Sequence, residues 1–340
     1  MNKAMLLTPS GTAAVAVIRI DGPGVSDFLN HCFDRPVLEG KCVYGRIHNG
    51  VRSIDDAIVT QQCNSANLNL HGGLWIVHEV MELLKRNGFE IITYSPTQTW
   101  AMDGETELDR EIAANLPLAR TELTLRILQN QHQAWQQLNL RQPQNQKLEQ
   151  MLADHVLEHL LNPPTVAIIG LPNVGKSTLA NQLFGQERSI TADLPGTTRD
   201  WVGELANIDG LVVKLIDTPG QRISTDTIET RAIEVSGPVI SAADLVVLVM
   251  DPTQEREPQI SLSNHWPDAI VVINKSDRAQ WPGDGIRTVA TTGTGIDLLR
   301  TEIRRRFGIF NIDESAPRCW TNRQKEEIRN SLRANSAIST

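Results

Sequence analysis

The 340-residue sequence contains no apolar stretch long enough to cross a bilayer, and its N-terminus has no extended apolar segment behind a basic start. Its four cysteines lack Cys-X-X-Cys spacing, and we expect them to be reduced thiols. The net charge of −8 and the pI near 5.5 provide no basic footprint for nonspecific nucleic-acid binding. These absences predict a soluble cytoplasmic protein that does not bind membranes.

Four short strings occur in a fixed order in the middle of the chain. They are GLPNVGKST at Gly170–Thr178, GTTRD at Gly196–Asp200, DTPG at Asp217–Gly220 and NKSD at Asn274–Asp277. In the first string, the glycines let backbone N–H groups approach phosphate oxygens, Lys176 neutralises those oxygens, and the Ser177 hydroxyl reaches Mg²⁺. An apolar run precedes this string and apolar residues at helical spacing follow it. This strand, loop and helix context is typical of a P-loop.

The fourth string indicates which base is bound. Asp277 can accept two hydrogen bonds from the N1–H and 2-amino edge of guanine. Asn274 and the aliphatic part of the Lys275 side chain would pack against the ring. Adenine lacks that pair of donors, and a carboxylate left unpaired against it would cost free energy. Together the four strings predict a guanine-nucleotide site.

Near-continuous Val, Ile and Leu runs predict the strands of the surrounding domain. They lie at Val166–Ile169, Leu211–Ile216, Leu245–Met250 and Ala269–Ile273. Such runs are typical of strands buried on both faces, which indicates a parallel α/β sheet with its ligand at the carboxyl ends of the strands. A final helix is expected at Ile296–Phe307.

The regions on either side of this domain have a different character. Up to about Ile92 the chain alternates short apolar and polar runs and contains a helical pattern at Trp75–Lys85, which predicts a small α+β domain. Two helical stripes separated by Pro143 follow, with apolar residues at Leu123, Ile127, Leu128 and Trp135 and then at Leu148, Met151, Leu152, Val156 and Leu160. Another helix is expected at Thr321–Ala334. A helical layer interrupted by the nucleotide-binding domain would explain helices on both sides of it.

Several strings carry a resemblance to a known family. TPSGTAAVAVIRIDGP near the N-terminus, LHGG at Leu70–Gly73, ITADLPGTTRDWV and TNRQKEEI together resemble the MnmE (TrmE) family of tRNA modification GTPases. In that family the GTPase domain is inserted into a helical domain, and the N-terminal domain dimerises and binds a folate. The resemblance therefore implies an α/β P-loop GTPase domain at residues 163–311, a small helical domain at 101–162 and 312–340, and an α+β domain at 1–100.

The sequence also departs from the family pattern. Among the positions that match the folate pocket only Arg19 is retained, and the segment before His71 reads CNSANLNL without the expected carboxylate. The chain ends at Thr340 in SLRANSAIST, where the family has a cysteine-containing motif. We therefore expect a divergent, shortened member, and we do not expect folate binding.

The resemblance also implies two metal sites. Ser177 and Thr198 match the protein ligands of Mg²⁺, whose preference for oxygen suits both hydroxyls. Asn173 matches the residue that binds K⁺ in potassium-activated members, and the remaining K⁺ ligands would come from Ala192, Leu194 and Thr197. A cation at that place substitutes for an arginine finger by neutralising charge that develops during phosphoryl transfer. Asn173 could instead be a loop-capping asparagine.

Two residues compete to orient the catalytic water. The family uses a glutamate that aligns with Glu229, whereas Gln221 follows Gly220 directly, at the place where Ras-type GTPases keep a water-positioning glutamine. Asp217 is expected to hold a metal-bound water. We favour Glu229 because Asn173 and GTTRD match the family mechanism, and Gln221 stays the alternative.

The full set of expected nucleotide contacts comes from the four strings and from the family resemblance, which adds residues 192–195, Ala290 and Thr291. It comprises Asn173, Val174, Gly175, Lys176, Ser177, Thr178, Ala192, Asp193, Leu194, Pro195, Gly196, Thr197, Thr198, Asp217, Thr218, Pro219, Gly220, Asn274, Lys275, Ser276, Asp277, Ala290 and Thr291. The expected function is Mg²⁺-dependent, K⁺-activated hydrolysis of GTP to GDP and phosphate, with a homodimer as the expected assembly. The near full-length resemblance implies a role with tRNA and a partner protein in wobble-uridine modification, whereas the missing cysteine motif favours the alternative. The alternative is a GTP-dependent conformational switch with no role in tRNA modification.

Overall fold

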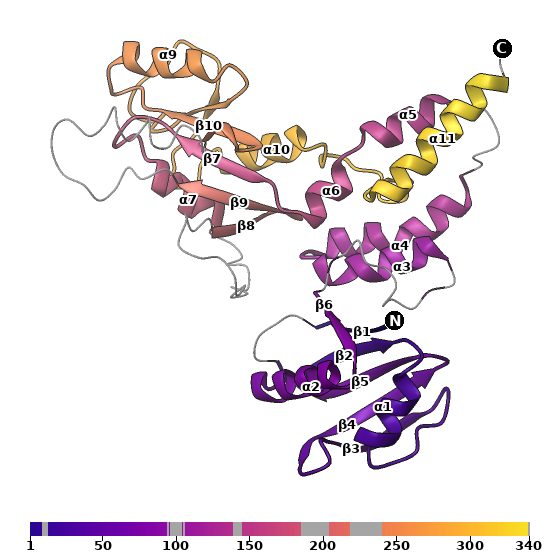
Figure 1. Cartoon of the computed structure of the whole chain (residues 1–340). Coiled ribbons are helices and arrows are strands. Elements are labelled where there is room, and N and C mark those ends of the chain that lie inside the picture. Colours follow the sequence, from indigo (N-terminus) through magenta and orange to yellow (C-terminus); the bar gives the residue numbers. More distant parts are fainter. Residues whose placement is uncertain are drawn as a thin grey trace. The chain divides into compact units, whose positions relative to one another are not determined.

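The computed structural model describes residues 1–8, 13–93, 95, 104, 106–138, 145–184, 204–217 and 240–338. They belong to two units, one running from Met1 to Ala114 and the other from Asn115 onward (Figure 1). Among the described helices, none combines the length and the apolar content needed to span a membrane.

The first unit is a six-stranded sheet with two helices packed on one face. Its strands are β1 (Asn2–Leu6), β2 (Val15–Asp21), β3 (Cys42–His48), β4 (Ser53–Gln62), β5 (Ser65–His71) and β6 (Phe89–Ile92), in the order β3-β4-β5-β2-β1-β6. The helices are α1 (Val25–Cys32) and α2 (Leu74–Arg86), and α3 (Glu107–Asn115) follows. The alternation of apolar residues buries Ile18, Ile20 and Leu68 beneath the two helices. The predicted α+β character and the helix near Trp75 agree with this arrangement.

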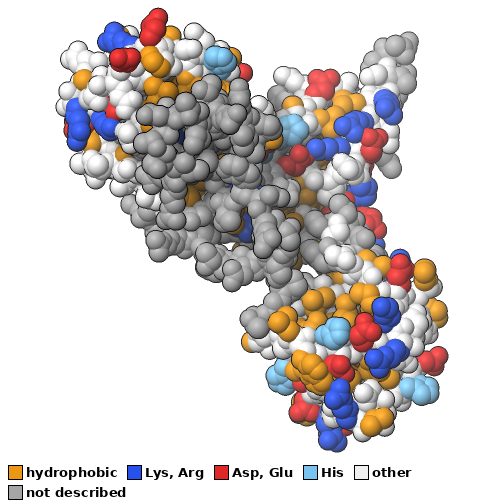
Figure 2. All heavy atoms as spheres, turned by 60° about the vertical axis from the view of Figure 1, so that its left-hand side comes forward, with side chains coloured by type: hydrophobic (Ala, Val, Ile, Leu, Met, Phe, Trp, Pro, Cys, Tyr) orange, Lys and Arg blue, Asp and Glu red, His pale blue; other side chains and the backbone are white. Residues whose placement is uncertain are grey.

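On the visible surface of this unit, at the lower right of Figure 2, hydrophobic, basic and acidic side chains are interspersed. Several of the exposed apolar side chains lie on strands, among them Val15, Tyr44 and Ile58. Tyr44 and Ile58 are direct partners in the β3–β4 ladder. Cross-strand partners stand on the same face of a sheet, so these two side chains form one exposed apolar pair.

The second unit contains the predicted nucleotide-binding domain. Its strands are β7 (Thr165–Ile169), β8 (Glu204–Ile208), β9 (Leu211–Asp217), β10 (Leu245–Met250), β11 (Ile270–Ile273) and β12 (Ile286–Arg287), in the order β12-β11-β10-β7-β9-β8. The helices of this domain are α7 (Lys176–Phe184), α9 (Arg256–His265) and α10 (Ile296–Arg306). β7 and β10 lie at the centre of the sheet and are buried almost throughout, as expected from their apolar runs.

The four predicted strands β7, β9, β10 and β11 pair in parallel, as expected, but the sheet has an additional edge strand that was not predicted from the sequence. Strand β8 pairs with β9 in the antiparallel sense. The turn between them contains Asp209 and Gly210, both with positive φ, at 48° and 97°. A tight hairpin requires such residues, and the short sequence of β8 has no long apolar run that would have identified it as a strand.

The remaining helices of the second unit lie on both sides of this domain in the sequence. They are the 3₁₀ turn η2 (Leu116–Leu118), α4 (Glu122–Gln136), α5 (Asn145–Ala153) and α6 (Val156–Leu161) before the domain, and α11 (Asn322–Ile338) after it. The expected single stripe from Leu148 to Leu160 is divided between α5 and α6. The division has a local cause, since the Asp154 carboxylate accepts a hydrogen bond from the Val156 N–H at 2.8 Å and so forms an Asx turn directly before α6. Helix α11 also continues beyond the expected Ala334.

Helices α4, α5 and α11 share one apolar core. Leu148 and Met151 of α5 pack with Ile328 of α11, and Cys319 completes the buried cluster. Burial raises the pKa of the Cys319 thiol to about 12, which keeps this group neutral in the core.

The segment between α10 and α11 is bonded along α4. Gln131 donates to the Ala316 carbonyl at 3.1 Å and accepts from the Arg318 N–H at 2.7 Å. The Trp135 indole donates to the Arg318 carbonyl at 2.9 Å. Arg126 donates to both carboxylate oxygens of Glu314, at 2.8 and 3.0 Å. The segment that follows the nucleotide-binding domain is therefore held against α4, a helix that precedes this domain in the sequence.

Candidate functional site

The predicted P-loop connects the end of β7 to the start of α7. Asn173, Gly170 and Gly175 all have positive φ, at 61°, 149° and 99°. A Cβ at Gly175 would lie 2.3 Å from the Asn274 amide nitrogen, so this position requires glycine for close approach as well as for its backbone angle. The buried Val174 anchors the loop in the domain core. The chain therefore wraps tightly around the start of α7, as a phosphate-binding loop does.

Lys176 places its ammonium group at this loop. The side chain is 92% buried and donates to the carbonyls of Gly170 at 2.9 Å and Leu171 at 3.0 Å. Ser177 follows in the first turn of α7 and is half-buried. The lysine charge and the helix N-terminus both favour an anion here. The arrangement can therefore hold a phosphate group.

Asn274, the first residue of the predicted base-recognition string, joins that string to the P-loop. Its buried amide donates to the Val174 carbonyl at 2.8 Å. Its side-chain oxygen accepts from the Ala290 N–H at 3.0 Å and from the Thr288 hydroxyl at 3.3 Å. These three bonds connect the phosphate loop, the end of β11 and the loop that follows β12.

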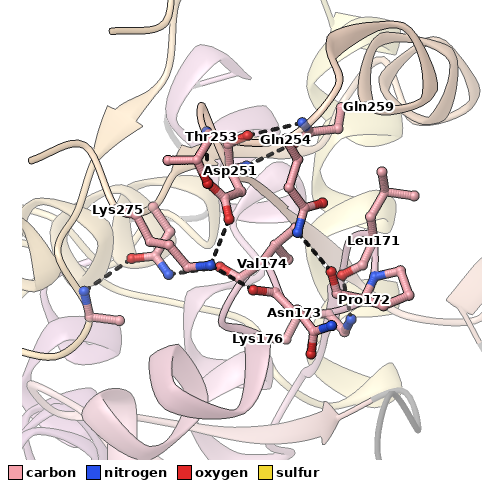
Figure 3. A network of polar contacts seen from close by, with 12 residues as sticks. Leu171, Pro172, Asn173, Val174, Lys176, Asp251, Thr253, Gln254, Gln259 and Lys275 are labelled. Atoms are coloured by element: carbon pink, nitrogen blue, oxygen red, sulfur yellow. Dashed lines mark hydrogen bonds and ion pairs between the residues drawn. The ribbon is translucent and has the colours of Figure 1, made fainter. Parts of the chain in front are cut away.

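Lys275 forms a second connection, shown in Figure 3. Its ammonium donates to the Asn173 carbonyl at 2.7 Å and to the fully buried Asp251 carboxylate at 2.6 Å. Asp251 also accepts from the Thr253 N–H at 2.9 Å and from the Thr253 hydroxyl at 2.6 Å. Burial raises the pKa of the Asp251 carboxyl, but the hydrogen bonds from Lys275 and Thr253 outweigh that effect and leave its pKa below the usual value. Asp251 is therefore a buried, compensated anion that fixes the lysine.

The other residues of the predicted base site differ in their exposure. Asp277 is exposed, and its carboxylate accepts no recorded hydrogen bond from the residues that the structure describes. The Ser276 hydroxyl donates to the Thr288 carbonyl at 3.1 Å, and Ala290 is buried while Thr291 is exposed. The Asp277 carboxylate can thus accept hydrogen bonds from a ligand.

Many of the predicted site residues lie outside the described residues. These are Ala192, Asp193, Leu194, Pro195, Gly196, Thr197, Thr198, Thr218, Pro219, Gly220, Gln221 and Glu229. Asp217 is described in its backbone alone, as the last residue of β9, where it is in register with Ile168 of β7. The metal and water-orienting roles assigned to these residues stay predictions. The structure does bring the first and fourth strings together.

Sequence reasoning missed the residues that hold these two strings in place. Asp251, Gln254 and Thr288 received no role, although each bonds to the site or to its neighbours. The sequence could have identified Asp251 as a site residue, because it is a charged residue directly after a buried strand and at the same sheet edge as the P-loop. Thr288 and Gln254 lie in ordinary polar stretches, which contain no comparable signal.

Comparisons with known proteins find similarity to GTPases. Residues 165–275 match the family model described as 50S ribosome-binding GTPase. The tRNA modification GTPase MnmE of Lactococcus lactis subsp. lactis is 29% identical over 371 residues, which cover 89% of this chain and 80% of that protein. MnmE of Bacillus subtilis is 26% identical over 374 residues, covering 92% and 81%. Among solved structures, the G domain of the T. maritima FeoB iron transporter aligns at 25% identity with a TM-score of 0.33, over 43% of this chain and 99% of that one.

The ion pair of Asp251 leads to a pH-dependence prediction. Because its pKa is lowered by folding, the carboxylate stabilises the fold above the ordinary aspartate pKa of about 3.9, and this contribution is lost as the pH falls below that value. Asp251→Asn should therefore reduce the free energy of unfolding most at pH 7, and the difference from wild type should shrink toward pH 3. Urea unfolding across this pH range measures the effect. The exposed Asp268→Asn is the control, and an Asp251→Asn deficit that is constant with pH would contradict the prediction.

Proposed function

Because this chain belongs to the MnmE (TrmE) family of tRNA modification GTPases, we propose that its GTP hydrolysis serves the modification of tRNA at the wobble uridine. The observation that carries the proposal is the extent of the similarity. Identity of 29% extends over 89% of the chain, so it includes the N-terminal unit and the helices as well as the nucleotide-binding domain. A GTPase domain borrowed by an unrelated protein would match over that domain alone.

The enzyme binds GTP and GDP and hydrolyses GTP. Its P-loop offers Lys176 and the N-terminus of α7 to the phosphates, and the exposed Asp277 carboxylate offers two acceptor oxygens to the base. Asn274 and Lys275 act in this proposal by holding the loops together. Asp277 therefore carries the discrimination between guanine and adenine.

The residues present fit the two proposed metal ions. Ser177 offers a hydroxyl oxygen in the first turn of α7, beside Lys176, and would hold Mg²⁺ together with Thr198. Asn173 is exposed, and its amide has no recorded hydrogen bond to the described residues, so its oxygen can hold K⁺ with Ala192, Leu194 and Thr197. Bound cations would supply positive charge at the phosphates during transfer. Glu229 is the proposed water-orienting residue, with Gln221 as the alternative.

We further propose that the GTPase domain at residues 163–311 is inserted into a helical domain formed by 101–162 and 312–340. Two features support this arrangement: the core shared by α5 and α11, and the bonds from α4 to the segment before α11. Residues 1–100 would form the dimerisation domain, and the exposed Tyr44 and Ile58 pair supports an apolar contact with a second copy. The proposed partners of the homodimer are tRNA and a protein of the same modification reaction.

One observation favours a second function, that of a GTP-dependent switch without a role in tRNA modification. Arg19 is the single retained position of the expected folate pocket, and its guanidinium donates to the Asn67 amide oxygen at 3.1 Å. An amide at this place supplies no negative charge, which agrees with the changed pocket expected from the sequence. In this alternative the nucleotide cycle alone would control partner binding.

The role in tRNA modification is tested in a bacterial strain that lacks its own MnmE. Expression of this protein should restore modified wobble uridine in tRNA, as measured by mass spectrometry of nucleosides, because the similarity extends over nearly the whole chain. Expression of Asp277→Asn in the same strain is the control for dependence on GTP. Unmodified tRNA in a strain that contains active GTPase would instead support the switch function.

Nucleotide choice depends on Asp277. Wild-type protein should bind GTP in preference to ATP, and Asp277→Asn should weaken GTP binding about tenfold to a hundredfold, because hydrogen bonds to a charged acceptor are lost. The same variant should gain affinity for xanthosine triphosphate, whose O2 can accept from the new amide. Competition against a fluorescent GDP analogue measures these affinities. The exposed Asp284→Asn is the control, and equal wild-type affinity for ATP and GTP would disprove the base assignment.

Activation by potassium depends on Asn173. GTP turnover should be faster in KCl than in NaCl at equal ionic strength, because Na⁺ is too small for a ring of oxygens that suits K⁺. Asn173→Ala should lose most of this difference while its turnover in NaCl stays near wild type. If wild type turns over equally in both salts, the cation proposal fails, and Gln221→Leu compared with Glu229→Ala would then identify the water-orienting residue.

A further inference from the structure

All five carbonyls from Gly170 to Val174 accept hydrogen bonds from side chains. Lys176, in the first turn of the helix that follows the loop, donates to the carbonyls of Gly170 and Leu171. The next three carbonyls are held by three different side chains that follow other strands (Figure 3). Gln254 donates to Pro172 at 3.0 Å, Lys275 to Asn173 at 2.7 Å, and Asn274 to Val174 at 2.8 Å. The loop is therefore held at each of these residues.

Holding the carbonyls also sets the direction of the N–H groups. A peptide unit is planar, and its C=O and the N–H of the next residue point in opposite directions. Fixing the carbonyls of Pro172, Asn173 and Val174 thus fixes the N–H groups of the residues that follow them, as far as Gly175. Backbone N–H groups are the donors with which a P-loop binds phosphate. A side chain that holds one of these carbonyls therefore also sets the direction of a backbone N–H donor in the loop.

Gln254 differs from the other two side chains because it lies outside the four strings. Its backbone N–H donates to the Asp251 carbonyl at 3.1 Å, in a turn that the Asp251 carboxylate closes through Thr253. Gln259 clamps the same turn, accepting from the Asp251 N–H at 2.7 Å and donating to its carbonyl at 3.0 Å. The half-buried Gln254 side chain is thus carried on a fixed backbone at the end of β10.

We propose that Gln254 is a positioning residue for GTP and GDP, which acts through the Pro172 carbonyl on the phosphate-binding N–H groups. It does not take part in the chemical step. Its loss loosens the first half of the P-loop, while the base contacts of Asp277 and the bonds of Asn274 and Lys275 remain. Binding of the diphosphate and of the triphosphate therefore weakens equally, because both use the same loop.

The test compares Gln254→Met with wild type at a fixed potassium concentration. Methionine matches the glutamine side chain in length and cannot donate. One lost hydrogen bond should raise the Kd for GDP and the KM for GTP about threefold to tenfold and leave kcat within about twofold. A fluorescent GDP analogue gives the Kd, and phosphate release gives KM and kcat. The matched control is Gln280→Met, an exposed glutamine of the same domain with no recorded bond to the described residues.

Rescue separates positioning from a general structural role. Gln254→Lys restores a donor of similar reach, and its Kd for GDP should return toward wild type. This rescue should persist when choline chloride raises the ionic strength, because screening removes a simple charge attraction to the phosphates. Unchanged GDP affinity in Gln254→Met would overturn the proposal. So would a fall in kcat without a rise in KM, or a Gln254→Lys variant that binds no better than Gln254→Met in high salt.

Discussion

The nucleotide site depends most on the hydrogen bonds of the Asn274 side chain. This buried amide bonds at once to the P-loop, to Thr288 and to Ala290, which places phosphate recognition and base recognition in a single network. Gly175 leaves just enough room for it, since any Cβ there would collide with the Asn274 nitrogen. The two halves of the site are therefore built against each other, and a change in one loop alters the geometry of the other.

The buried charge of Asp251 also stabilises this network. Removing Asp251 from water is unfavourable, and the carboxylate is tolerated because Lys275 and Thr253 provide three donors. The same lysine reaches the Asn173 carbonyl, so the compensation of the charge also fixes the P-loop. A neutral residue at Asp251 could fill the space but would leave the ammonium without its partner.

Helices of the second unit contact the sheet at the turn between β8 and β9. The Thr121 hydroxyl, at the N-cap of α4, donates to the Gly210 carbonyl at 2.9 Å in the turn between β8 and β9. Asp209 of the same turn pairs with Arg300 of α10, which also donates to the Leu183 carbonyl at the end of the P-loop helix. A direct hydrogen bond from this hairpin thus connects the nucleotide-binding domain to the start of α4.

The sequence alone determined the chemistry of the site and the kind of fold around it. Lys176 and Asp277 stand in strings whose spacing is dictated by phosphate and guanine, and buried runs such as Leu245–Met250 can form few structures other than central strands. The tertiary structure decided the antiparallel β8, the division between α5 and α6, and the roles of Asp251 and Gln254. These depend on single turns and on bonds between residues as much as 82 positions apart, and hydrophobic periodicity does not encode such contacts.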